Sequence, residues 1–224
     1  MFQYSRHRTE AFQRGERLEL KLGENMGRSG YALDRYPIEA TLTDAEPTEP
    51  YGWYESEKYF DANLIRPELS RPKHLHDDTL ALAETIRRAD SVSIHFRRTD
   101  LIKSVNHADP YESGYYERAI AFIRERVENP IFFIFSEDLD WCRENVTLAP
   151  AYLVAENEAP GREHEDLWLM SQCRHSIIAN STFSWWGSRL GEVRREGIKI
   201  APAQWFKPGT YDDTDLIPTR WTRL

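Results

Sequence analysis

The chain has 224 residues and carries 29 lysines and arginines against 37 aspartates and glutamates, which gives a formal net charge of −8. This balance argues against a nucleic-acid partner, which needs a basic face, so any anion must be bound by local groups. No apolar run approaches the ~20 residues of a membrane helix. Cys142 and Cys173 show neither metal-binding nor redox spacing, which favours buried thiols in a reducing compartment.

The first part of the chain predicts few regular elements. Residues 23–50 are rich in Gly, Pro and Thr and have no sustained hydrophobic period. The predicted elements are a helix at 1–14, a strand at 17–22, and a helix at 77–89 with Leu80, Ala83 and Ile86 on one face. Since regular alternation begins only afterwards, we predict one domain at 1–90 and a second at 91–224.

Strands and helices alternate regularly after residue 90. The predicted strands are 91–96, 131–135, 151–154, 175–179 and 198–201. The predicted helices are 113–127, 138–145, 163–173 and 183–190. This alternation predicts an α/β fold with a parallel, doubly wound sheet. No signal-peptide pattern opens the chain, so a cytoplasmic location is expected.

The strand at 91–96 ends in a compact polar cluster, because residues 95–100 read His-Phe-Arg-Arg-Thr-Asp. A guanidinium pairs with phosphate through parallel hydrogen bonds and stays charged at any ordinary pH. In open α/β sheets, ligands bind beyond the carboxyl ends of the strands. The cluster therefore predicts a diphosphate site. The alternative is a solvated charge run in which Asp100 pairs with an arginine.

A second polar segment follows the strand at 175–179. Asn180, Ser181 and Thr182 offer hydroxyls and an N-cap for the next helix. The free N–H groups and the dipole of a helix start favour an anion. The alternative is an ordinary capped helix. Trp185 and Trp186 on that helix are predicted to pack in the core rather than to contact a ligand.

Both segments resemble signatures of one enzyme family. Residues 95–100 resemble the His-x-Arg-Arg-x-Asp signature of α-1,2-, α-1,6- and protein O-fucosyltransferases. Residues 166–187 resemble the long Asp-Leu to Trp-Trp-Gly block of the α-1,2-fucosyltransferases, glycosyltransferase family 11. Residues 1–4, 52–60 and 130–138 also resemble segments of that family, in the same order.

The resemblance implies two Rossmann-like domains of GT-B type, with an acceptor-side domain at 1–90 and a GDP-fucose-binding domain at 91–224. It implies an inverting transfer of L-fucose from GDP-fucose to the 2-hydroxyl of a β-galactoside. The expected partners are GDP-fucose and a glycan acceptor, with no metal or other cofactor. A lipid-linked acceptor of polysaccharide biosynthesis would add peripheral association with the inner membrane.

The family's Gly-x-Gly-Asn-Gln opening would precede Met1, so the N-terminal domain is expected to be incomplete. The resemblance predicts an upstream extension of roughly ten residues that encodes a strand and this glycine-rich loop. Without that extension, the 224-residue chain is expected to bind GDP but to transfer fucose poorly.

Roles can be assigned to individual residues. Arg97, Ser181 and Thr182 would stabilise the departing diphosphate, while the resemblance places His95 and Asp166 on the guanosine. Arg98 and Asp100 are predicted to brace the loop as an ion pair. The donor site is also expected to include Arg98, Asn180 and Ser184. The general base is open between Asp100, His107 and Asp109.

Two alternative functions stay open. The chain could be an inactive remnant that only binds a GDP-sugar. It could also be a metal-dependent glycosyltransferase that uses Asp138 and Asp140, which follow a strand as Asp-Leu-Asp. Against the metal, the same two acids suit the first turn of a helix, where they complement its dipole.

Overall fold

The computed structural model describes residues 1–21, 33–43, 52–98, 101, 103–154, 161–192 and 194–224. These residues form two compact units, Met1–His74 and Leu75–Leu224. The boundary lies before the predicted position near residue 90. The reason is that helix α3 (Asp77–Arg88) contributes its apolar face, including Leu82 and Ile86, to the core of the second unit.

The first unit is built around helix α1 (Phe2–Arg14), which ends at Gly15 with a φ of 70°. Strands β1 (Leu18–Lys21) and β2 (Ala40–Thr43) form a parallel pair. The short helices are η1 (Leu33–Arg35), η2 (Glu57–Tyr59) and α2 (Ala62–Leu69). The helix at 1–14 and the strand at 17–22 are confirmed within a few residues, whereas β2 and α2 were not predicted.

Buried polar contacts join α1 to α2 in this unit. The Arg8 guanidinium donates to Glu68 at 3.0 Å and to Glu39 at 2.6 Å. The Tyr4 hydroxyl also donates to Glu68, and both Tyr4 and Glu68 are buried. The carboxylate of Glu68 is therefore paired, as a buried charge requires.

The second unit contains a six-stranded sheet in the order β5-β4-β3-β6-β7-β8, and every neighbouring pair is parallel. The strands are β3 (Asp90–Phe96), β4 (Pro130–Ser136), β5 (Ala151–Leu153), β6 (His175–Ile177), β7 (Lys199–Ala201) and β8 (Thr222–Arg223). The predicted parallel α/β architecture is confirmed for this unit. The short strand β8 was not predicted.

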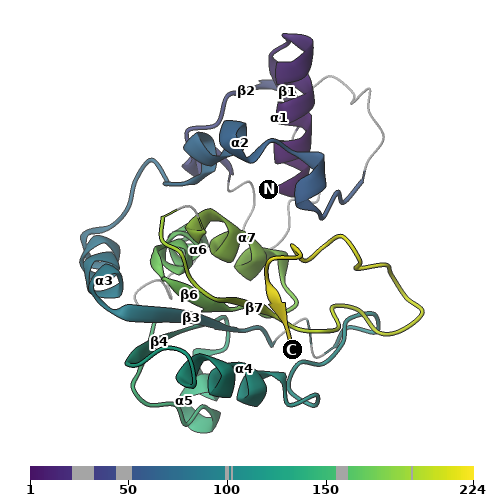
Figure 1. The fold of residues 1–224 in the computed structure, drawn as a ribbon. Coiled ribbons are helices and arrows are strands. Elements are labelled where there is room, and N and C mark those ends of the chain that lie inside the picture. The colour runs from purple at the N-terminus through teal and green to yellow at the C-terminus, as the bar shows by residue number, and fades with distance from the viewer. Residues whose placement is uncertain (22–32, 44–51, 99–100, 102, 155–160, 193) are drawn as a thin grey trace. The chain divides into compact units, whose positions relative to one another are not determined.

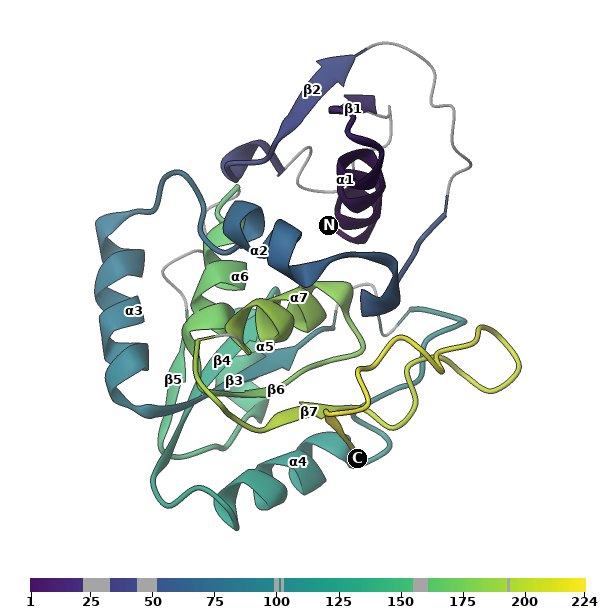
Figure 2. The same cartoon turned by 45° about the horizontal axis from the view of Figure 1, so that its top comes forward.

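Helices cover both faces of this sheet, as Figure 1 shows. Helices α4 (Tyr115–Arg124) and α5 (Leu139–Asn145) lie on one face. Helices α6 (Glu163–Gln172) and α7 (Thr182–Gly191) lie side by side on the other face (Figure 2). Strand β4 explains this layering, because Phe132 and Ile134 enter the core under α4 while Phe133 and Phe135 enter the core under α3 and α6.

The tryptophans of α7 belong to the core. Trp185 is wholly buried and Trp186 is 3% exposed. The Trp185 indole donates to the Leu216 carbonyl at 2.9 Å, which satisfies its polar edge. The packing role predicted for this pair is confirmed. Among the described residues, no helix combines the length and apolar character needed to cross a membrane.

Candidate functional site

The candidate site lies where the strand order of the sheet reverses. The chain adds β4 and β5 on one side of β3 and then returns to place β6 on the other side. Ile94 and Ile177 are partners in the register of β3 and β6. Arg97 and Asn180 each follow that pair by three residues, so both lie beyond the carboxyl ends of adjacent strands. Such a switch point is where open α/β sheets bind ligands.

The two predicted segments touch at this point. The His95 ring lies 5.8 Å from the Phe183 ring, between centroids, at an interplanar angle of 48°. His95 is buried at the end of β3, and Phe183 lies in the first turn of α7. The arginine-bearing strand end and the start of α7 therefore form one site.

Side chains hold the main chain at the end of β3 in a fixed position. Each residue from 95 to 98 has a main-chain group that bonds to a side chain. The bonds are Tyr116 Oη to His95 O at 2.8 Å, Ser136 Oγ to Phe96 O at 2.7 Å, Tyr111 Oη to Arg97 O at 3.1 Å, and Arg98 N to Glu137 Oε1 at 2.6 Å. These bonds preorganise the backbone that carries the Arg97 side chain, which is half-buried.

The Arg98 side chain contacts the loop after β4 and the start of α5. Its guanidinium lies 3.8 Å from the centroid of the Trp141 ring and donates to Asp138 at 3.3 Å. The predicted partner Asp100 lies outside the described residues. The bracing role predicted for Arg98 thus has Asp138 as its described partner, on the neighbouring loop after β4.

The acids of the proposed metal motif have structural contacts. Asp138 is the N-cap of α5, and its carboxylate accepts from Trp141 N at 3.2 Å. Asp140 lies in the first turn of α5, where it pairs with Arg143 at 2.7 Å and is 91% exposed. These contacts match the helix-start interpretation of both acids. Among the described residues, no three His, Cys, Asp or Glu side chains form a group that could hold a metal ion.

The start of α7 offers main-chain donors. Ser181 is the N-cap residue, but its side chain makes no capping bond, and no acidic residue lies in the first turn. The Ser184 hydroxyl donates to the Ser181 carbonyl at 3.3 Å. The half-buried Thr182 begins the helix. Within the described residues, neither the N-cap side chain nor an acid of the first turn competes for the first N–H groups of α7, which suits an anion-binding helix start.

The side-chain amide of Asn180 is buried and holds two loops in position. Its side chain is wholly buried and donates to the carbonyls of Ala108 at 2.8 Å and Trp205 at 3.0 Å. These carbonyls belong to the loop after β3 and the loop after β7. Asn180 thereby fixes both loops beside the start of α7.

The described base candidates are both held by local contacts. The Nδ1 atom of His107 lies 2.8 Å from Ser104 Oγ, and its ring lies 5.1 Å from the Phe206 ring. One carboxylate oxygen of Asp109 accepts from the N–H groups of Tyr111 and Glu112 at 2.7 and 3.3 Å. The turn contacts of Asp109 are typical of an aspartate that stabilises a loop.

Asp166 lies half-buried in the first turn of α6, next to a residue that sequence reasoning missed. The neighbouring Glu165 is wholly buried and accepts from Arg162 at 3.0 Å, Thr79 at 2.5 Å and the His76 main chain at 3.2 Å. Burial alone would raise the pKa of Glu165, but these hydrogen bonds outweigh it and lower the pKa to about 2. Glu165 thus fixes the start of α6, and with it the backbone of Asp166.

The second unit is accordingly a Rossmann-like α/β unit with an arginine and a helix start at its switch point. The family model described as glycosyl transferase family 11 matches residues 53–223. The chain belongs to glycosyltransferase family 11, which confirms the resemblance drawn from residues 95–100 and 166–187.

Three relatives illustrate the similarity. The chain is 35% identical over 179 residues to an alpha-1,2-colitosyltransferase of Escherichia coli, covering 77% of this chain and 61% of the relative. It is 30% identical over 183 residues to the O-antigen biosynthesis glycosyltransferase WbnK of Escherichia coli, covering 80% and 56%. It is 30% identical over 139 residues to the galactoside 2-alpha-L-fucosyltransferase Sec1 of Mus musculus, covering 56% and 38%.

The chain therefore spans 61% or less of the length of each of these relatives. No solved structure matches the chain at a significant level.

Proposed function

We propose that the protein transfers L-fucose from GDP-fucose to the 2-hydroxyl of a β-galactoside with inversion at C1. Family membership and the galactoside fucosyltransferase among the relatives support this activity. The O-antigen enzyme among the relatives supports a surface polysaccharide as acceptor. The proposal includes a facing N-terminal domain of GT-B type and a cytoplasmic location at which a lipid-linked acceptor is reached.

One observation carries the proposal: the end of β3, which continues into Arg97, lies against the start of α7 at the switch point between β3 and β6, where the His95 ring contacts the Phe183 ring. In the transfer, the bond between C1 of fucose and the β-phosphate oxygen breaks, and its electron pair leaves with GDP. The acceptor hydroxyl forms the new bond to C1 and loses its proton to a base. Arg97, Ser181 and Thr182 would stabilise the charge that grows on the β-phosphate, without a metal ion.

The nucleotide base would be selected by Asp166. A carboxylate can accept from both N1–H and N2–H₂ of guanine, whereas adenine offers no such pair. His95 would contact the same nucleoside. The proton acceptor in the transfer is proposed among Asp100, His107 and Asp109, of which Asp109 already accepts two main-chain hydrogen bonds.

The relative with 35% identity favours a second donor, because its name states colitosyl rather than fucosyl transfer. The diphosphate contacts proposed for Arg97 would be the same for both sugars. Assays with GDP-fucose and with nucleotide-activated colitose, each with a β-galactoside acceptor, separate the two donors. The donor with the higher kcat/KM identifies the activity.

Calorimetric titration with GDP tests the nucleotide site directly. Arg97→Ala should weaken binding at least tenfold, and Arg97→Lys should restore little, because a lysine lacks the planar pair of donors. Arg194→Ala is the matched control, since Arg194 is an exposed arginine of the same unit. Equal affinities for the wild type and Arg97→Ala would refute the proposal. GDP binding without transfer would favour the inactive remnant.

A further inference from the structure

Two loops beside the candidate site are joined to each other. Residues 103–109 follow β3, and residues 205–212 follow β7; together we call them the loop pair. The N–H of Lys207 donates to the Asn106 carbonyl at 2.7 Å, and the N–H of Ala108 donates to the Trp205 carbonyl at 3.2 Å. His107 and Phe206 form an antiparallel bridge between these bonds. The loop pair is therefore an ordered surface and not two independent loops.

A row of aromatic rings crosses the loop pair. The His107 and Phe206 centroids are 5.1 Å apart, and the Phe206 and Tyr211 centroids are 5.2 Å apart at an interplanar angle of 65°. His107 and Phe206 are half-buried, whereas Tyr211 is 63% exposed. The outer ring of the row is thus supported from below and open to solvent.

A tight turn sets the position of Tyr211. Residues 207–210 read Lys-Pro-Gly-Thr, and the N–H of Thr210 donates to the Lys207 carbonyl at 3.2 Å. Gly209 has a φ of 80°, as the third residue of a type II turn after proline requires. The Thr210 hydroxyl donates to the Lys207 carbonyl at 2.7 Å and lies 3.3 Å from the Asn106 carbonyl. The exposed ring is consequently held by a defined turn.

The loop pair is attached to the candidate site by Asn180. This residue donates to a carbonyl in each loop, Ala108 and Trp205, and it directly precedes Ser181. At the end of the loop pair, the Trp205 N–H donates to Asp213 at 2.9 Å, and Asp213 pairs with Arg223 at 3.2 Å. A ligand seated on Tyr211 would therefore lie over a rigid extension of the donor site.

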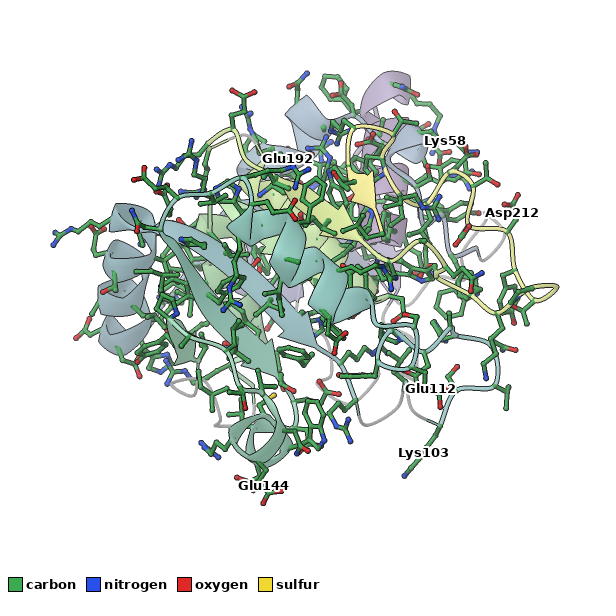
Figure 3. The ribbon with its side chains drawn as sticks, turned by 60° about the horizontal axis from the view of Figure 1, so that its bottom comes forward. Lys58, Lys103, Glu112, Glu144, Glu192 and Asp212 are labelled. Carbon is green, nitrogen blue, oxygen red and sulfur yellow. The ribbon has the colours of Figure 1, made fainter. Side chains whose placement is uncertain are left out.

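The surroundings of the exposed ring fit a sugar. Lys207 and Asp212, in the same loop as Tyr211, are exposed, and in Figure 3 the Asp212 side chain points outward from that loop. A small aromatic face with a charged rim can stack on the C–H face of a pyranose and hydrogen-bond its hydroxyls. A protein partner would need a larger continuous apolar surface.

From these contacts we infer that the row His107–Phe206–Tyr211 is a binding subsite for a sugar ring of the glycan acceptor. The inference rests on the proposed function, because it assigns the acceptor of that reaction to a surface beside the proposed donor site. Tyr211 would provide the stacking face, and Phe206 and the Pro208–Gly209 turn would hold it in place.

The kinetic test compares three variants with β-galactoside acceptors. Tyr211→Ala should raise the acceptor KM about tenfold while the donor KM stays unchanged, and Tyr211→Phe should keep most of the binding because the ring remains. Tyr152→Ala is the matched control, since Tyr152 is 42% exposed and packs on Phe133 at 6.0 Å, at the edge strand β5. An unchanged acceptor KM in Tyr211→Ala would overturn the subsite.

A binding test separates this inference from the proposed function. Saturation-transfer NMR with a β-galactosyl, a β-glucosyl and an N-acetylhexosaminyl disaccharide needs no donor and no turnover. The wild type should give a sugar signal that Tyr211→Ala loses and Tyr152→Ala keeps, while calorimetry shows equal GDP affinity for all three proteins.

Each other outcome has a defined meaning. A sugar signal without measurable transfer supports the subsite and counts against the proposed activity. No signal from any sugar with the wild type overturns the subsite. A signal lost in Trp53→Ala, where the first unit has an indole side chain 69% exposed, but kept in Tyr211→Ala, also overturns it.

Discussion

The two ends of the sheet in the second unit differ in the hydrogen bonds that a buried charge makes. At the carboxyl end, Glu165 is wholly buried but accepts hydrogen bonds from Arg162, Thr79 and His76. At the amino end, Lys199 is 5% exposed and donates to the Arg174 carbonyl at 3.0 Å. The first charge is matched by donors, whereas the second meets a neutral acceptor.

The pKa values express this difference. Hydrogen bonds lower the pKa of Glu165 to about 2 against the effect of burial, so the charged form is favoured in the folded protein. Burial lowers the pKa of Lys199 to about 8, so its charged form is disfavoured. The contacts of Glu165 therefore stabilise a buried charge at the end of the sheet with the candidate site. At the opposite end, the buried charge of Lys199 lowers the stability of the folded protein.

The largest expected effect is at Glu165. Glu165→Ala leaves the Thr79 hydroxyl and the His76 N–H without their acceptor, while Arg162 keeps Asp78 at 2.7 Å, and the free energy of unfolding should fall by about 2–4 kcal/mol. Denaturant unfolding measures this change, and Glu163→Ala at an exposed position of the same helix turn is the control. A loss as small as that of the control would show that the network does not stabilise the charge.

The pH dependence of this contribution has a definite sign. The pKa of Glu165 is about 2 in the folded protein, below its ordinary value of 4.5. The unfolded chain therefore binds the proton more tightly, and the stabilisation is complete above about pH 4.5 and is lost as the pH falls toward 2. The stability difference between wild type and Glu165→Gln should shrink over that interval.

The next effect is a gain of stability at the other end of the sheet. Lys199→Met removes a buried cation and should raise the free energy of unfolding at pH 7 by about 1–3 kcal/mol. Because the folded pKa of about 8 lies below the ordinary 10.5, the cost of Lys199 is complete below pH 8 and disappears by about pH 10.5. The gain should therefore vanish at high pH.

Lys103→Met is the matched control for this variant, since Lys103 is exposed (Figure 3) and its replacement should change the stability by less than ~0.5 kcal/mol. If Lys199→Met lowers the free energy of unfolding across the whole pH range, the buried charge of Lys199 does not destabilise the protein. The difference inferred between the two ends of the sheet would then be wrong.

The sequence predicts the sheet better than the contacts that hold the site. The strand at 131–135 was found because a parallel strand covered on both faces is a continuous apolar run, and the strand at 91–96 because Val92, Ile94 and Phe96 alternate with polar residues. The helix α2 was missed because Pro67 lies inside it, and β8 because it contains only Thr222 and Arg223.

In the candidate site, too, the positions of residues along the chain could be predicted, but most of their contacts could not. Arg97 and Ser181 could be placed from the sequence, since each follows a predicted strand and parallel strands end at one edge. The partner of Arg98, which is Asp138, and the hydroxyl of Tyr116 on the His95 carbonyl are contacts between segments distant in sequence. Glu165 likewise has no local signal that separates it from the neighbouring acids, because its donors Thr79 and His76 come from α3 and the residue before it.

A smaller effect is expected in the choice of nucleotide base. Asp166→Asn should narrow the preference for GDP over ADP and UDP by about tenfold, because an amide can accept only one of the guanine N–H donors while it presents its own N–H₂ to the other. Thermal-shift titrations with the three nucleotides measure the preference. Glu163→Gln, in the same turn, should leave it unchanged. Equal binding of the three nucleotides by the wild type would remove the role proposed for Asp166.

The smallest expected effect is that of removing metal ions with a chelator. This experiment tests whether the positive charge at the carboxyl end of the sheet comes from arginine side chains or from a bound metal ion. Asp138 already caps α5 and pairs with Arg98, and Asp140 pairs with Arg143. Transfer should therefore continue in excess EDTA, and Asp140→Asn should keep near-normal turnover. Asp138→Asn should also retain most of the activity, because an asparagine still caps the helix. Activity that is lost on chelation and restored by Mn²⁺ would favour the metal-dependent alternative, and it would mean that the arginines alone do not supply the positive charge at this end of the sheet.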